Sequence, residues 1–191
     1  GTLEYTFMAP VHRLVHLAGV SIYAVSYSML RTVVILFALA VFLNVSFAGA
    51  NLLGILAVLL VASMAFIGLG LVAAILPVMS PERGEEATHI FQGVLLLVSG
   101  VYYPVQVLPK WVQPLSVVSP ATYALSASRR LLGTDNPHST PTQLISEPLS
   151  SVLPELGILL LMGVALIPFG LWVFSRAESW AKRTGKLKRT G

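Results

Sequence analysis

Long apolar stretches separated by short polar breaks dominate the amino-acid sequence. Between Leu14 and Pro81, Arg31 is the only residue that carries a full charge at neutral pH. A water-soluble domain keeps charged residues on a solvated face of each element, whereas a helix that crosses a bilayer needs about 20 mostly apolar residues. The pattern therefore predicts an all-α fold, a polytopic transmembrane helix bundle.

The apolar runs predict four crossings within a transmembrane domain of residues 31–175. They are expected at about residues 31–47, 52–79, 87–103 and 153–175. The first apolar run starts near Leu17, and as one helix rising about 1.5 Å per residue it would exceed the membrane thickness. Residues 1–30 are therefore assigned to a cytoplasmic coupling and entry region. Arg31 is expected at the cytoplasmic boundary, where its long side chain can reach water, and a substrate-binding arginine in mid-membrane is the alternative.

The second apolar run is rich in small residues at spacings of three and four. They are Ala62, Ala65, Gly68, Gly70, Ala73 and Ala74. Small residues let two helices approach closely within a membrane, so this run predicts tight helix packing, with the lining of a substrate path as the alternative. Pro77 and Pro81 are expected to end the helix, because proline does not continue a helix interior.

A series of prolines follows the third crossing. They are Pro104, Pro109, Pro114 and Pro120. Proline can start a helix but not continue one, so residues 104–132 are predicted to form short, broken, re-entrant helices near the external side. The last of them is expected to be capped by Ser119 and stopped by Gly133, with Arg129 and Arg130 complementing its C-terminal dipole.

Basic residues are concentrated in the tail, residues 176–191, which holds six of the twelve Lys and Arg residues. A basic cluster directly after an apolar segment is the usual cytoplasmic anchor at an anionic leaflet, and this favours membrane lipid over nucleic acid as the partner. With the C-terminus cytoplasmic, four crossings return the N-terminus to the cytoplasm. Lys110, Arg129 and Arg130 then lie on the external side, which the positive-inside rule disfavours.

The chain lacks the residues of an internal energy source. It has no G-x-x-x-x-G-K-[ST] phosphate loop, no cysteine and no His/Asp/Glu pattern with metal spacing, so no metal, cofactor or catalytic residue is predicted. The predicted crossings also lack buried Asp, Glu or Lys, which ion-coupled transporters generally need. A multi-span protein of this kind is passive, structural or driven from outside the chain.

Several motifs are distinctive in their order. They are Gly1-Thr2-Leu3-Glu4, Pro10 and Arg13 at the start, and then Ser99-Gly100-Val101-Tyr102-Tyr103-Pro104, Leu108-Pro109-x-Trp111, Ser119-Pro120-Ala121-Thr122-Tyr123 and Arg129-x-Leu131-Leu132-Gly133. Together they resemble ABC exporter permeases of the type-2 class, which includes bacterial drug-resistance and polysaccharide or lipid export permeases. These motifs follow the family's order and spacing over nearly the whole chain.

The resemblance implies two permeases, identical or paralogous, that pair with cytoplasmic ABC ATPase subunits holding ATP and Mg, in a bacterial or archaeal plasma (inner) membrane. It also implies six crossings per permease, so the first two are expected to be missing here. The residues expected to couple to the ATPase are Gly1, Thr2, Leu3, Glu4, Pro10 and Arg13. Those expected at the external gate are Gly100, Tyr102, Tyr103, Pro104, Pro109, Trp111, Pro120 and Tyr123.

The function that the resemblance implies is ATP-driven outward movement of amphipathic drugs or of lipid- or polysaccharide-type substrates. One alternative is a membrane-embedded transferase, for which only the polar turn with Glu82, Glu85, Glu86 and His89 could supply chemistry. Solvated carboxylates are favourable beside a helix N-terminus in any case, so we interpret that turn as a surface feature. The other alternative is a membrane assembly subunit that transports nothing.

Overall fold

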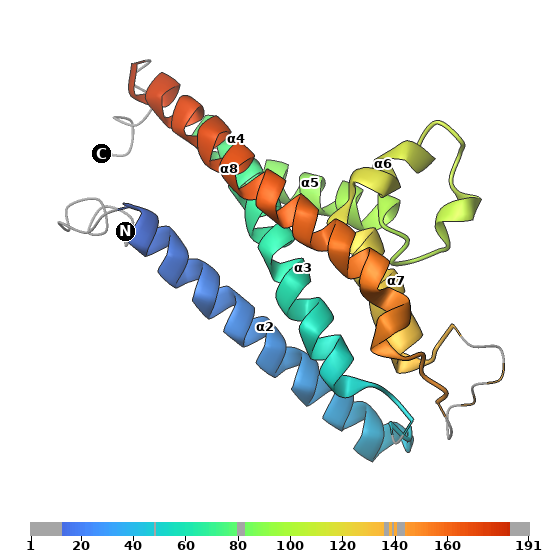
Figure 1. Ribbon diagram of the computed structural model, residues 1–191. Coiled ribbons are helices and arrows are strands. Elements are labelled where there is room, and N and C mark those ends of the chain that lie inside the picture. The colour runs from blue at the N-terminus through green and yellow to red at the C-terminus, as the bar shows by residue number, and fades with distance from the viewer. Residues whose placement is uncertain are drawn as a thin grey trace. The chain divides into compact units, whose positions relative to one another are not determined.

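The computed structural model describes residues 13–47, 49–79, 83–135, 138, 140 and 144–183, and its elements are helices (Figure 1). The α-helices are α2 (Arg13–Leu43), α3 (Leu52–Ala73), α4 (Ile75–Met79), α5 (Gly84–Val98), α6 (Gln113–Val118), α7 (Pro120–Leu132) and α8 (Leu153–Arg183). Two short 3-10 helices, η1 (Val105–Val107) and η2 (Leu149–Val152), lie between them. The predicted all-α fold is confirmed.

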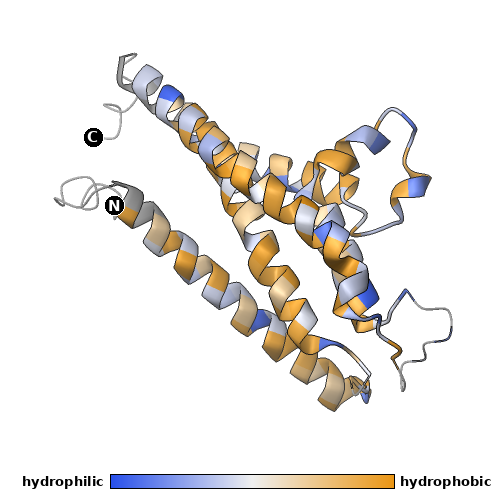
Figure 2. Ribbon diagram, viewed as in Figure 1, coloured by the Kyte–Doolittle hydropathy of each residue, from blue (hydrophilic) through white to orange (hydrophobic). Residues whose placement is uncertain are grey.

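Three helical stretches of the described chain are long and apolar enough to cross a membrane. They are Ala18–Leu43, Leu52–Pro77 and Leu149–Ala177. Figure 2 shows hydrophobic residues along the length of α2, α3 and α8. The fold is therefore that of a helical membrane bundle, as the hydropathy pattern predicted.

The third predicted crossing, residues 87–103, differs from the helix found there. Helix α5 has 15 residues, Gly84–Val98, and is not among the three apolar stretches. At about 1.5 Å per residue it is shorter than the roughly 30 Å hydrocarbon core of a bilayer. A crossing at α5 stays a prediction, and it would have to include the turn that follows Val98.

The chain divides into two compact units, residues 1–45 and 46–191. The first unit contains α2, a single helix of 31 residues that runs through Arg31 without a break. The apolar stretch of α2 begins at Ala18, upstream of the predicted boundary at Arg31. The second unit contains all other described helices.

Helices α3 and α8 pack closely along their small residues. A Cβ atom built at Gly68 would lie 2.6 Å from the carbonyl carbon of Leu166, and one built at Gly170 would lie 2.8 Å from the Gly68 carbonyl oxygen. Ala62 and Ala65 are buried on the same helix. The predicted close packing is confirmed for these residues, but Gly70 is exposed and has no neighbour within 4 Å.

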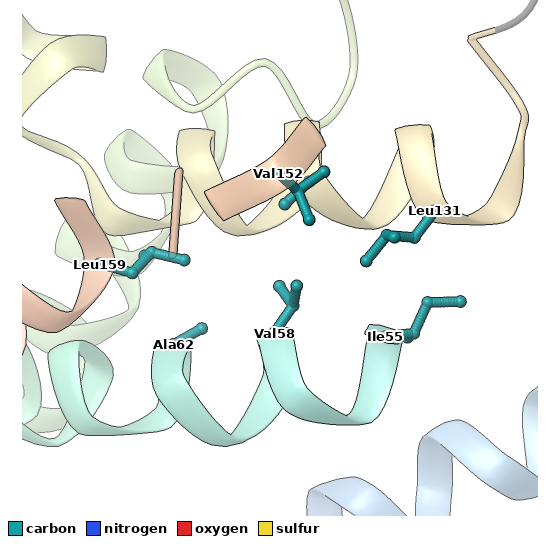
Figure 3. Packing of buried hydrophobic residues seen from close by; sticks show 7 residues of the cluster. Ile55, Val58, Ala62, Leu131, Val152 and Leu159 are labelled. Atoms are coloured by element: carbon teal, nitrogen blue, oxygen red, sulfur yellow. The ribbon is translucent and has the colours of Figure 1, made fainter. Parts of the chain in front are cut away.

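A cluster of buried hydrophobic residues joins α3, α7 and α8 at one end of the second unit (Figure 3). Its members are Ile55, Val58 and Ala62 of α3, Ala127 and Leu131 of α7, Val152 of η2 and Leu159 of α8. In Figure 3 the side chains of α3 point toward those of Leu131, Val152 and Leu159. We call this region the α7 end of the bundle.

Pro77 does not end the helix, contrary to the prediction. Helix α3 ends at Ala73, and after a turn at Ala74 the chain forms α4, which contains Pro77. Proline is tolerated here because it lies in the first turn of α4, where its missing N–H needs no partner. Gly84 packs so closely on Pro77 that a Cβ atom would clash with the proline, so α4 and α5 meet in tight contact. Pro81 lies outside the described residues.

Candidate functional site

The α7 end contains α7, the last part of the predicted external segment, and α7 has the predicted bounds. Pro120 occupies the first turn, and Gly133 ends the helix with a φ of 80° in the left-handed region. A Cβ atom at Gly133 would lie 2.5 Å from the carbonyl oxygen of Ile145, so both conformation and space favour glycine. Arg129 and Arg130 lie in the last turn, as predicted.

Ser119 occupies the N-cap position of α7, but its side chain makes no capping hydrogen bond, and the predicted cap is wrong in this respect. Its hydroxyl oxygen lies 2.7 Å from that of Ser99, which is the first residue after α5. The Ser99 hydroxyl also donates to the Leu95 carbonyl, so the geometry favours Ser119 as the donor between the two serines. Both side chains are buried.

Arg130 binds two carboxylates from different elements. Its Nε and Nη2 atoms donate to Glu147 Oε2 at 2.9 Å and 2.7 Å, and its Nη1 atom donates to Glu155 Oε1 at 2.6 Å. Glu147 belongs to the loop before η2, and Glu155 lies in the first turn of α8. The side chains of Arg130, Glu147 and Glu155 are 28%, 42% and 16% exposed. Charge-assisted hydrogen bonds of this kind are about twice as strong as neutral ones, so Arg130 is the main polar link between α7 and α8.

The ion pairing of Arg130 with Glu147 shifts the pKa of each group. The Glu147 hydrogen bonds raise the pKa of Arg130, and the Arg130 hydrogen bonds, together with one from Ser151, lower the pKa of the Glu147 carboxyl. Because the carboxyl pKa is lowered on folding, its stabilising contribution is complete at neutral pH. That contribution is lost as the pH falls through the lowered value.

Arg129 makes a weaker link to another helix. Its Nη2 atom donates to the Gly100 carbonyl oxygen at 3.3 Å, near the long limit of a hydrogen bond. Gly100 follows α5 and has a φ of 76°, which a residue with a side chain adopts only under strain. The contacts of Arg129 and Ser119 therefore attach the end of α5 to α7.

Backbone hydrogen bonds complete the α7 end. The Asn51 amide donates to the Leu131 carbonyl at 3.0 Å, and the Glu147 amide donates to the Arg130 carbonyl at 3.1 Å. The Asn51 side chain caps α3 by accepting from the Gly54 amide at 2.9 Å. The Leu131 carbonyl thus binds the start of α3, and the Arg130 carbonyl, which also accepts from the Gly133 amide, binds the loop before η2.

The predicted gate residues separate into two groups. Gly100 and Pro120 are buried, and Tyr123 packs against the hydrophobic cluster. Tyr102 and Trp111 are exposed, with 69% and 79% of their surfaces accessible within this chain. The remaining predicted residues are also not buried, Tyr103 being half-buried and Pro104 and Pro109 exposed. The structure therefore packs Gly100, Pro120 and Tyr123 within the second unit, and it leaves Tyr102 and Trp111 exposed.

Sequence reasoning missed both carboxylates at this site. Glu155 lies inside the predicted fourth crossing and is largely buried, so the expectation of no buried Asp or Glu in a crossing is wrong at this residue. Its Oε2 atom is buried and binds no group among the described residues. The sequence did offer one signal for this pairing. Between Ala87 and Ser175 the only acidic residues are Asp135, Glu147 and Glu155, so few carboxylates could pair with Arg130 in that part of the chain.

The predicted ATPase-coupling residues lie largely outside the described part of the chain. Gly1, Thr2, Leu3, Glu4 and Pro10 belong to residues 1–12, and Arg13 begins α2 without a described side chain. Their role stays a prediction.

The charged residues described in the acidic turn are exposed. Arg83, Glu85, Glu86, His89 and Ile90 line an open surface depression. His89 Nε2 lies 4.0 Å from Glu85 Oε1, and both side chains are mostly exposed. Within the described ranges no group of three or more His, Cys, Asp or Glu residues could hold a metal ion, and Glu82 lies outside them. The described residues of this turn behave as solvated side chains.

No curated protein and no solved structure is similar enough to this chain to count as a match. The family model of the ABC-2 type transporter matches residues 1–132, which are most of the 191 residues and run from the predicted coupling region to the end of α7. The chain therefore belongs to the ABC-2 type transporter family, whose members are permease components of ABC transporters.

Proposed function

We propose that this chain is the membrane-spanning subunit of an ATP-driven exporter that moves amphipathic drugs or lipid- or polysaccharide-type molecules outward. The observation that carries the proposal is the family match over residues 1–132, which include two of the three apolar helical stretches. ATP hydrolysis would occur in a separate cytoplasmic ABC ATPase. Two permease copies, or this chain and a paralogue, would enclose the path in a bacterial or archaeal plasma membrane.

The proposed orientation places the basic tail in the cytoplasm and the α7 end outside. The sequence raised one objection, the external position of Lys110, Arg129 and Arg130. The six Lys and Arg residues of the tail outnumber these three, and Arg130 is paired in the fold with Glu147 and Glu155. Arg176 stacks on Trp172 at 5.0 Å, as expected for a cation at the opposite, lipid-facing boundary.

The test is reconstitution of the intact permease with its partner ATPase in vesicles. We expect ATP-dependent and vanadate-sensitive movement of at least one amphipathic probe, from a panel holding ethidium, a fluorescent phospholipid and a lipid-linked sugar. A complex that assembles and hydrolyses ATP but moves none of these compounds would contradict the proposal. A chain that binds no ATPase would contradict it more directly.

Loss of the predicted coupling residues should uncouple ATP hydrolysis from transport. We expect Glu4→Ala and Arg13→Ala, in the intact protein, to reduce ATP-dependent transport by about ten-fold or more, because the ATPase must push a fixed cytoplasmic segment to do work on the permease. Transport and the amount of co-purified ATPase would be measured together. Full transport with normal assembly in both variants would remove these residues from the coupling role.

The acidic turn provides a contrasting prediction. Replacing Glu85 and Glu86 by Gln and His89 by Ala should change transport by less than about two-fold, because exposed side chains away from packed features contribute little. A transferase that used this turn would lose its activity in the triple variant. Retained transport in that variant would therefore dismiss the enzyme alternative.

A further inference from the structure

Helix α5 is attached to the rest of the second unit mainly at its two ends. At its start Gly84 packs on Pro77 of α4. At its end the links are the Ser99–Ser119 hydrogen bond, the Arg129–Gly100 hydrogen bond and contact with α6. Helices α3, α7 and α8, in contrast, share the hydrophobic cluster that contains Leu131, Val152 and Leu159.

Helix α7 has two contacts that could separate, which we call the α5–α7 joint and the α7–α8 joint. They differ in what their separation would expose. Separating α7 from α8 would break the ion pairs of Arg130 and expose the hydrophobic cluster to water. Separating α5 from α7 would break one hydrogen bond between two hydroxyl groups and one long bond from the Arg129 guanidinium to a carbonyl oxygen, and it would expose Val98, Ser99 and Ser119. Water can replace the bond between the two hydroxyl groups with little net loss and can solvate the Arg129 guanidinium once its long bond breaks, whereas breaking the partly buried ion pairs of Arg130 leaves carboxylates without partners.

The Ser119 hydroxyl could also form a different hydrogen bond, to the backbone of α7. It stands at the N-cap position of α7 without using its side chain as a cap. If Ser99 moved away, the Ser119 hydroxyl could rotate to accept from an amide of the first turn of α7, which is the usual bond of an N-cap serine. Ser99 would keep its bond to the Leu95 carbonyl. Neither hydroxyl would then be left without a partner when the joint opens.

From these observations we propose that the α5–α7 joint opens during transport while the α7–α8 joint stays closed. Ser99, Ser119, Gly100 and Arg129 form the joint that opens, and Arg130, Glu147 and Glu155 are positioning residues that hold α7 on α8. The contact between Pro77 and Gly84 serves as the pivot of α5. This proposal rests on the proposed function, since it describes how the path of the exporter opens at the α7 end.

The absence of cysteine from the chain makes thiol reporters specific within it. Val98→Cys places a thiol beside the α5–α7 joint and keeps both serines, and Val152→Cys is the control inside the hydrophobic cluster. Both native side chains are buried. A membrane-impermeant maleimide is applied from the α7 side to the intact complex with its ATPase, first without nucleotide and then with ATP and vanadate.

We expect the labelling rate of Val98→Cys to rise about five-fold or more with ATP and vanadate, and that of Val152→Cys to change by less than about two-fold, as for a local opening confined to one joint. Equal labelling of Val98→Cys in both states would overturn the proposal. A rise at Val152→Cys as large as that at Val98→Cys would overturn it as well, since it would mean that α7 separates from α8.

A disulfide staple tests the same joint through transport. Ser99→Cys/Ser119→Cys would tie α5 to α7, and Met64→Cys/Gly163→Cys is the matched control between α3 and α8, where a Cβ atom at Gly163 would lie 3.0 Å from that of Met64. Oxidation of the first pair should reduce transport of the probe moved by the wild type about ten-fold, and reduction should restore it, because a gate that cannot open blocks turnover. Because a side chain at Gly163 is itself tightly packed, the control is compared with its own reduced form, and oxidation should leave most of that transport intact.

Continued transport by the oxidised Ser99→Cys/Ser119→Cys variant would overturn this inference without affecting the proposed function. Failure of the proposed function would appear differently, as a wild-type complex that moves no probe. The labelling experiment needs no transported probe and decides the inference in that case too.

Discussion

Gly68→Ala is expected to destabilise the protein, whereas Gly70→Ala on the same helix is expected to have little effect or to stabilise it. The added methyl group at Gly68 would meet the Leu166 carbonyl carbon at 2.6 Å and the Ile167 amide nitrogen at 2.7 Å. These are backbone atoms, so α3 and α8 must separate. Overpacking of this kind costs about 1–3 kcal/mol.

The control, Gly70→Ala, adds the same methyl group at a position that has room for it. No atom lies within 4 Å of a Cβ atom there, and alanine is the better helix former by up to about 1 kcal/mol. Unfolding of both variants in mixed detergent micelles gives the two free-energy changes. Equal stability of Gly68→Ala and Gly70→Ala would show that the close contact between α3 and α8 is absent in the membrane protein.

Arg130→Met should be the most damaging single change among the charged residues of the α7 end. It removes the partner of Glu155 Oε1, and the side chain of Glu155 is only 16% exposed. The other carboxylate oxygen, Oε2, already binds no described group, so neither oxygen would then have a partner among the described residues. Removing one member of a fully buried pair costs about 3–5 kcal/mol, and the partial exposure of this group reduces our expectation to about 2 kcal/mol. The free energy of unfolding would be measured as for Gly68→Ala.

Three further variants separate the ion pair from general disruption. Arg130→Met/Glu155→Leu should recover most of the lost stability, because no charge is then left unpaired. Glu147→Gln should cost much less than Arg130→Met, since this carboxylate is 42% exposed. Arg129→Met, the neighbour on the same turn, loses one hydrogen bond of 3.3 Å and should also cost less than about 1 kcal/mol. Equal losses at Arg129 and Arg130 would contradict the assignment of Arg130 as the link to α8.

Several features of this protein could be predicted because they depend on local sequence. Apolar runs of sufficient length predict membrane helices directly, since the bilayer requires both apolar side chains and internally bonded backbone. The bounds of α7 followed from Pro120 and Gly133, whose backbone preferences start and stop a helix with no help from distant residues. The motifs around residues 99–133 predicted the family for the same reason: they are contiguous in the sequence.

Other features needed the fold because they join residues far apart in the chain. The sequence could not choose between Gly68 and Gly70, since α3 is apolar on all sides and carries no pattern that marks the face toward α8. It assigned Ser119 as a cap, yet its hydroxyl binds Ser99, which is 20 positions away. Arg130 similarly finds Glu147 and Glu155 at separations of 17 and 25 residues.

What the sequence determined by itself is thus the class of protein, the helices and their local stops, because hydropathy and backbone preference act within a few residues. Only the tertiary structure decided which small residues touch, which hydroxyls pair and which carboxylates bind Arg130. Those choices depend on the distance between elements, and no periodicity within a single helix encodes that distance.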